Sequence, residues 1–204
     1  MIKAGKRYLA LPFALIGLAL TGATTSVQMG NERTREESVM TEQNAEDGGR
    51  DPQRDFDFII GNWKVHNRRL KQRLKGSNSW EEFEGASVAR KIWGGAGNVD
   101  EYEADSPSGR IQGMTVRLYN PKSQQWSIYW ANSASGVLET PMIGSFKDGR
   151  GEFYDQEFFE GKSIYVRFIW SNITGASARW EQAFSADGGK TWETNWVMEL
   201  TRSK

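Results

Sequence analysis

The sequence contains no cysteine, and this absence removes several classes of function at once. Disulfide bonds, thiol catalysis and cysteine-based metal sites are all excluded. His66 is the single histidine, so a cluster of histidines cannot hold a metal, and a Ser-His-Asp triad would depend on this one residue. A glycine-rich phosphate loop followed by a helix is also missing. We therefore expect no metal site and no cofactor.

The chain also lacks an excess of either charge. Its 26 basic and 26 acidic residues cancel, so there is no basic field to hold nucleic acid or an anionic membrane surface. Proline is scarce at five residues, whereas 22 glycines indicate many tight turns. Nine Trp, ten Phe and six Tyr supply a large surface for burial. This composition favours short strands around an aromatic core.

Long apolar runs are missing except for one near the start. Lys3, Lys6 and Arg7 precede an apolar segment at residues 9–20, and small residues follow at positions 21–23. This order is typical of a secretory signal, and the apolar part is short for a membrane span. Residues 1–23 are thus predicted to be a signal peptide cleaved near Ala23. We expect a periplasmic or secreted protein with no transmembrane segment in the mature chain.

Residues 24–53 contain no aromatic residue and many carboxylates. Such a segment cannot bury enough apolar surface to offset its ordering entropy, which predicts a flexible acidic linker. Residues 54–204 are then expected to form one domain. At its start, Phe56, Phe58 and Ile59 are predicted to cover one end of this domain as a short helical turn.

Strand-like segments follow, separated by turn residues at the spacing expected of barrels or sandwiches. Short hairpins between consecutive strands predict an antiparallel up-and-down meander, and closing it into an all-β barrel removes exposed edges. The ten expected strands lie at residues 63–74, 80–93, 98–104, 111–119, 126–133, 137–146, 152–159, 163–173, 178–185 and 191–202.

The first and last strands of this pattern carry residues that resemble a known signature. Gly61 and Trp63 on the first strand, with Arg202 on the last, resemble the lipocalin signature. The resemblance implies a ten-stranded lipocalin-like (calycin) barrel in which the guanidinium lies over the indole, a cation on an aromatic face.

A closer resemblance covers almost everything after Arg54. Its motifs are Asp55-Phe56-Asp57-Phe58 with Gly61-Asn62-Trp63, and residues 66–70, 80–85, 97–101 and 179–196. They look like an uncharacterised bacterial family, described as a domain of unknown function in the calycin group. That group includes fatty-acid-binding proteins and the haem-binding nitrobindins. The resemblance implies the barrel but brings no established activity. A haem site on the nitrobindin pattern needs a late histidine, and the segments from residue 163 onward contain none.

A barrel of this size can enclose one small ligand, so inward polar residues are the candidates for binding it. Tyr165 and Arg167 are two positions apart and share a face, which would let a phenol and a guanidinium converge on a carboxylate or phosphate. The alternative is that Arg167 forms an internal ion pair with Glu157 or Glu181.

Three tryptophans and one amide complete the predicted cavity. Trp180 and Gln182 share a face of one strand, Trp196 lies on the next strand, and Trp130 is a further wall residue. These side chains would either surround a small apolar or amphiphilic ligand, one that could be anionic, or simply fill the core.

Two other classes of function stay open. Asn98 and Glu101 follow the glycine-rich hairpin at residues 94–97, which is predicted to rim the open mouth. They are further candidates for binding the ligand, and as an alternative they could support acid-base catalysis. Alternatively, Phe168 and Trp170 could form an outer apolar face for a protein partner or a homodimer. The sequence leaves open the ligand, the oligomeric state and which barrel end is open.

Overall fold

The computed structural model describes residues 49–203. The predicted signal peptide and the linker up to residue 48 lie outside the described residues. No helix within the described range is long and apolar enough to cross a membrane. The elements are η1 (Pro52–Arg54), η2 (Asp57–Ile59), β1 (Gly61–Leu70), β2 (Trp80–Ile92), η3 (Trp93–Gly95), β3 (Gly97–Ser106), β4 (Gly109–Asn120), β5 (Gln125–Asn132), β6 (Val137–Leu138), β7 (Met142–Lys147), β8 (Arg150–Phe159), β9 (Lys162–Ser171), β10 (Ser177–Ser185) and β11 (Glu193–Arg202).

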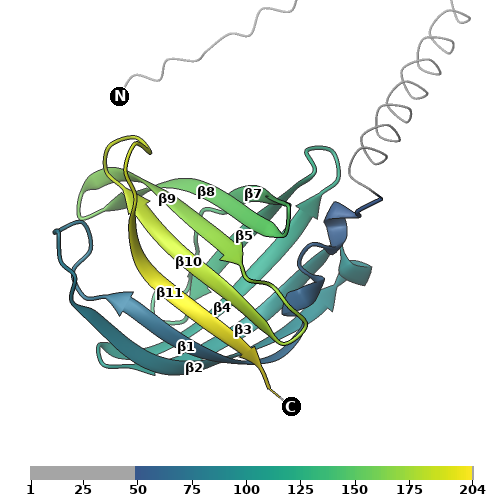
Figure 1. The fold of residues 1–204 in the computed structure, drawn as a ribbon, viewed down its shortest axis with the longest axis horizontal. Helices are drawn as coiled ribbons and strands as arrows, with labels where there is room; N and C mark the ends of the chain where they lie inside the picture. Colours follow the sequence, from purple (N-terminus) through teal and green to yellow (C-terminus); the bar gives the residue numbers. More distant parts are fainter. Residues whose placement is uncertain (1–48, 204) are drawn as a thin grey trace, which may run out of the picture. The chain divides into compact units, whose positions relative to one another are not determined.

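Ten of these strands form a closed antiparallel barrel (Figure 1). Neighbouring strands follow the order β4-β3-β2-β1-β11-β10-β9-β8-β7-β5, and pairing of β4 with β5 closes the circle. The first and last strands meet in the wall, with Trp63 opposite Arg202. The predicted all-β, ten-stranded, lipocalin-like barrel is confirmed.

Alternation along each strand sorts the side chains into an inner and an outer set. On β1, Trp63, Val65 and Asn67 are buried, whereas Lys64 is exposed. His66 also lies outside the barrel, where its Nδ1 is 2.6 Å from a carboxylate oxygen of Glu84 on β2. This follows from the two-residue period of a strand.

One predicted strand is divided into two in the structure. Residues 137–146 do not form one strand, since β6 ends at Leu138 and β7 begins only at Met142. Pro141 lies in the interruption, where it has no N–H to offer a neighbouring strand. β7 pairs with β8 as far as Tyr154, and residues 139–141 make no backbone hydrogen bond to β8. The wall is therefore weakly closed between β6 and the second half of β8.

The residues before β1 close one end of the barrel, as predicted. Phe56 and Ile59 are each only 1% exposed. The ring of Phe56 meets the edges of Trp126 and Phe146 at centroid distances of 5.1 and 4.9 Å. The Trp126 indole N–H donates to the carbonyl of Pro52 at 3.0 Å. Figure 1 shows η1 and η2 at the end of the barrel opposite the β1–β2 turn.

The residues before β1 that close this end of the barrel are called the plug below. Arg202 holds the plug against the barrel. Its guanidinium carbon lies 4.3 Å from the centroid of the Trp63 ring. Its Nη1 and Nη2 donate to the carbonyls of Ile60 and Phe58 at 2.7 and 2.8 Å. Gly61 has a φ of 116°, and a Cβ there would come within 2.8 Å of Nη1. The glycine is needed both for the backbone bend and for the space that the guanidinium occupies.

We expect Arg202→Ala to lower the free energy of unfolding by about 3 kcal/mol, because charge-assisted hydrogen bonds to the plug and a cation on an aromatic face are lost together. Denaturant unfolding followed by tryptophan fluorescence measures this. Arg110→Ala is the matched control, since Arg110 forms an exposed ion pair with Glu103, and its loss should cost less than about 1 kcal/mol. Equal losses in the two variants would show that Arg202 does not hold the plug.

Candidate ligand-binding site

The interior of the barrel contains a cavity of about 300 Å³. This volume lies at the lower end of the range for small-molecule sites. A water-sized group occupies about 30 Å³, so the cavity has room for roughly ten such groups. Its wall is mostly apolar. The aromatic residues that line it are Tyr102, Trp130, Phe159, Phe168, Trp170, Trp180, Phe184 and Trp196.

A buried ion pair lies at the plug end of the cavity. A guanidinium nitrogen of Arg117 is 2.8 Å from a carboxylate oxygen of Asp100, and both side chains are 5% exposed. The same guanidinium donates to Asn98 Oδ1 at 3.0 Å, and the backbone N–H of Thr115 donates to Asp100. The two charges offset each other, so this end of the cavity is polar but carries no net charge.

Three polar atoms on cavity-lining residues are buried without a hydrogen-bond partner in the described part of the chain. They are Ser87 Oγ, Arg117 Nε and Trp170 Nε1. Buried polar atoms almost always have partners, because an unpaired group loses its hydration without compensation. Two of the three are obligate donors, so these groups suit an acceptor oxygen of a molecule bound in the cavity.

A hydrogen-bond network joins β1, β3 and β11 in the cavity wall. The Tyr102 hydroxyl and the Trp196 indole N–H both donate to Asn67 Oδ1, at 2.9 and 3.0 Å. The Asn67 amide in turn donates to the carbonyl of Val65. Burial raises the pKa of Tyr102 to about 12, so the phenol stays neutral and remains a donor. The network holds the indole of Trp196 in place without any change of charge.

Two carboxylates reach the cavity from the weakly closed part of the wall. Glu139 follows β6 and Glu157 lies on β8, and both line the cavity. Burial raises the pKa of each carboxyl, and the charges of Asp155 and Glu139 raise that of Glu157 further. This side of the cavity therefore disfavours ionised carboxylates.

The structure brings four of the predicted site residues together. Trp130, Trp180, Gln182 and Trp196 all line the cavity. A Cβ at Gly113 would come within 2.0 Å of the Trp130 ring, so a glycine on β4 makes room for this indole. Their role in binding a ligand stays a prediction.

The predicted anchor pair lies elsewhere, and this expectation is corrected. Tyr165 is 42% exposed on the outer face of β9, and neither Tyr165 nor Arg167 lines the cavity. The Arg167 guanidinium instead lies 4.5 Å from the ring of Trp192. No ion pair joins Arg167 to Glu157 or Glu181 in residues 49–203. The inward positions of β9 belong to the alternate set, which begins with the buried Ile164.

The alternation along β9 also contradicts the prediction that Phe168 and Trp170 form an outer apolar face. Phe168 and Trp170 line the cavity, and their rings meet Trp180 and Phe56 inside the barrel. They cannot offer an outer apolar surface to a partner. The homodimer stays a prediction without the surface on which it was based.

Asn98 and Glu101, predicted to bind the ligand or alternatively to support catalysis, lie on opposite sides of the barrel wall. Asn98 is buried against Arg117, whereas Glu101 is exposed on the outer face of β3. The preceding hairpin lies at the plugged end, where Lys91 forms a 2.7 Å ion pair with Asp57 of η2. It does not rim the mouth, because the opposite end carries the β1–β2 turn and the open side of the cavity.

Sequence reasoning missed several residues of the site. Asp100 and Tyr102 share the parity of Asn98 on β3, and this alternation could have identified them. Ser87 and Arg117 have the same kind of signal on their strands. Arg73 lies in the turn after β1, where no periodicity applies, so only the tertiary structure shows that it reaches the cavity.

Among residues 49–203, no group of three or more His, Asp or Glu side chains is placed to hold a metal ion. No protein-family model and no curated protein sequence matches the chain. The resemblance to a bacterial family of unknown function therefore stays a prediction.

Solved structures with similar folds exist. The S-type phycobiliprotein lyase CPES from Guillardia theta is 13% identical with a TM-score of 0.50, over 73% of this chain and 90% of that one. A fluorescence-activating β-barrel made by de novo design is 11% identical with a TM-score of 0.40, over 72% of this chain and 95% of that one. The structure of EF1p2_mFAP2b bound to DFHBI is 9% identical with a TM-score of 0.42, over 75% and 100%. At such identities the likeness to the lyase shows the barrel fold alone.

We expect Glu157→Gln to stabilise the protein at neutral pH. A raised pKa means that the folded state binds the proton more tightly than the unfolded state, so stability is lost as the pH rises through the raised value. The gain of the variant should vanish below the ordinary carboxyl pKa of 4.5, where wild-type Glu157 is protonated in both states. Denaturant unfolding over a pH series measures this.

The control for this comparison is Glu101→Gln, which removes an exposed carboxylate on the outer face of β3. Its effect should stay within about 0.5 kcal/mol at every pH. A Glu157→Gln variant that is less stable than wild type at neutral pH would contradict the assignment of Glu157 as a half-buried carboxyl without an ion-pair partner in residues 49–203.

Proposed function

We propose that this protein is a small-molecule-binding barrel whose ligand is partly apolar and occupies the interior cavity. The observation that carries the proposal is a mostly aromatic cavity of about 300 Å³ whose lining includes three residues with a buried, unpaired polar atom, namely Ser87 Oγ, Arg117 Nε and Trp170 Nε1. A ligand with an acceptor oxygen at its inner end pairs with these groups, and its apolar remainder contacts the indole and phenyl rings.

The cavity wall is preorganised for this role. Trp180 packs edge to face against Trp196 and Phe168, at centroid distances of 5.8 and 4.8 Å. The Trp196 indole is fixed by its bond to Asn67, and Gln182 is fixed by its bond to Asn195 at 2.8 Å. Side chains that are already ordered lose little entropy when a ligand enters, so their contacts contribute more of their energy to affinity.

We further propose that the protein acts after export, in the periplasm or outside the cell. The support is the order of charged, apolar and small residues in positions 1–23. A fold without cysteine does not depend on the redox state of that compartment, since its stability rests on the aromatic core.

We expect wild-type protein to bind 1-octanol saturably with one molecule per barrel, because the alcohol joins an apolar chain of suitable volume to one polar oxygen. Isothermal titration calorimetry gives the affinity and stoichiometry. Ser87→Leu places a larger apolar side chain in the cavity and removes a polar partner, so it should weaken binding by about tenfold or more.

Val88→Leu is the matched control, because Val88 is the next residue of β2 but is 55% exposed on the outer face. Its affinity for 1-octanol should equal that of wild type. Native mass spectrometry of undenatured protein provides a second measurement, in which a bound small mass is expected. Absence of saturable binding to wild type in both measurements would overturn the proposed function.

A further inference from the structure

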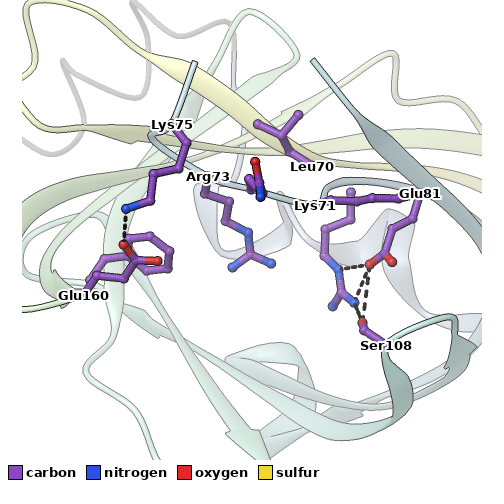
Figure 2. Close-up of a pocket in the computed structure, with 10 residues that line it drawn as sticks. Leu70, Lys71, Arg73, Lys75, Glu81, Ser108 and Glu160 are labelled. Carbon is purple, nitrogen blue, oxygen red and sulfur yellow. Dashed lines mark hydrogen bonds and ion pairs between the residues drawn. The ribbon is translucent and has the colours of Figure 1, made fainter. Parts of the chain in front are cut away.

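A second, larger hollow lies at the mouth of the barrel. It has a volume of about 870 Å³, and the residues that line it are Arg69, Leu70, Lys71, Gln72, Arg73, Lys75, Glu81, Ser108, Phe159 and Glu160 (Figure 2). We call this hollow the vestibule. Arg73 and Phe159 line both the vestibule and the interior cavity. A molecule bound in the cavity therefore meets the vestibule at these two residues.

The vestibule lining carries more cations than carboxylates, and its two carboxylates are already paired. Glu81 accepts from Arg69 Nε at 2.8 Å and from Nη2 at 2.7 Å. Glu160 lies 2.6 Å from the ammonium nitrogen of Lys75. Figure 2 shows both pairs, with Arg73 between them. Arg73 and the exposed Lys71 are the cations of this lining that have no carboxylate partner among residues 49–203.

Arg73 is the better placed of the two for binding a ligand. Its guanidinium forms no hydrogen bond and no ion pair with any residue in 49–203, and its carbon lies 5.9 Å from the ring of Phe184 in the cavity wall. Burial lowers the pKa of Arg73, and the charge of Arg69 lowers it further. A partly buried guanidinium without an acceptor leaves its donors available to an anion.

The carboxylates that act on Arg73 do not compete for it. They are Glu81 and Glu193. Glu81 is held by Arg69, and Glu193 accepts the backbone N–H of Leu74 at 2.7 Å. Both carboxylates bond to other groups and neither forms an ion pair with Arg73, so the Arg73 guanidinium keeps its hydrogen-bond donors available where the vestibule joins the cavity.

We propose that Arg73 binds the carboxylate of an amphiphilic ligand whose apolar part lies in the interior cavity. This inference rests on the proposed function and adds the chemical class and the orientation of the ligand. The planar guanidinium matches a carboxylate with two parallel hydrogen bonds. The apolar chain of the ligand contacts the aromatic wall beyond Phe159 and Phe184. The Asp100–Arg117 pair at the plug end carries no net charge, so it does not attract a second anion.

The cavity also contains Glu139 and Glu157, which would favour a cation if they were ionised. Neither carboxylate is among the charges that act on Arg73, and burial raises the pKa of both. The test therefore has to separate an anionic ligand from a cationic one with the same chain.

The experiment compares octanoate, 1-octanol and octylammonium by isothermal titration calorimetry at neutral pH. Wild type should bind octanoate at least about tenfold more tightly than 1-octanol, and octylammonium most weakly. Arg73→Gln should remove the preference for octanoate and leave the affinity for 1-octanol unchanged. Arg73→Lys keeps the charge without the planar fork and should retain part of the preference.

Lys71→Gln is the matched control, since it removes one positive charge from the same turn and should retain the preference for octanoate. Equal affinities of wild type for octanoate and 1-octanol, or tighter binding of octylammonium, would overturn the carboxylate assignment while leaving binding in the cavity intact. A preference that persists in Arg73→Gln would overturn the role of this residue. Failure of wild type to bind any of the three probes would overturn the proposed function and this inference together.

Discussion

The contact between Arg202 and Trp63 is the constraint on which the rest of the structure depends. It joins the last strand to the first and binds the carbonyls of Phe58 and Ile60, so one side chain closes the barrel and holds its plug. In the circular strand order, the contact lies opposite the place where β7 pairs with β5 over only three residue pairs. The guanidinium of Arg202 is partly buried, so its hydrogen bonds to the plug and its attraction to the indole are stronger than they would be in open water.

Plugging one end makes the interior asymmetric. At the plug, Asp100 and Arg117 neutralise each other and leave only unpaired hydrogen-bonding atoms. At the mouth, the ion pairs of Arg69 and Lys75 leave Arg73 without a partner among the described residues. Aromatic rings line the cavity between the two ends. A molecule that is polar at its ends and apolar in the middle fits this order, and the proposed orientation follows from the position of the Arg73 guanidinium, which forms no ion pair in the described residues.

Much of the fold could be predicted from the sequence. Turn residues between alternating segments determine the number of barrel strands, and the Gly61, Trp63 and Arg202 positions indicate which strands meet. The exception is residues 137–146, where Pro141 interrupts the strand. The candidate site was less predictable. Trp130, Trp180, Gln182 and Trp196 were placed on the cavity wall, where they lie. Tyr165 and Arg167 were assigned to the interior, and Glu101 to the rim of the mouth, although all three belong to the outer face of their strands.

The sequence by itself determined the strand pattern, the plug and the separation of residues into two faces on each strand, because these follow from local periodicity and turn chemistry. Only the tertiary structure decided which of the two faces points inward on β9, where both faces carry apolar residues and alternation cannot choose between them. It also decided which barrel end is open and which cations of the described mouth lack a carboxylate partner. Those outcomes depend on contacts between strands, as when Arg69 of β1 pairs with Glu81 of β2 and Arg73 is left without an ion pair in the described residues, and the pattern within a single strand does not encode them.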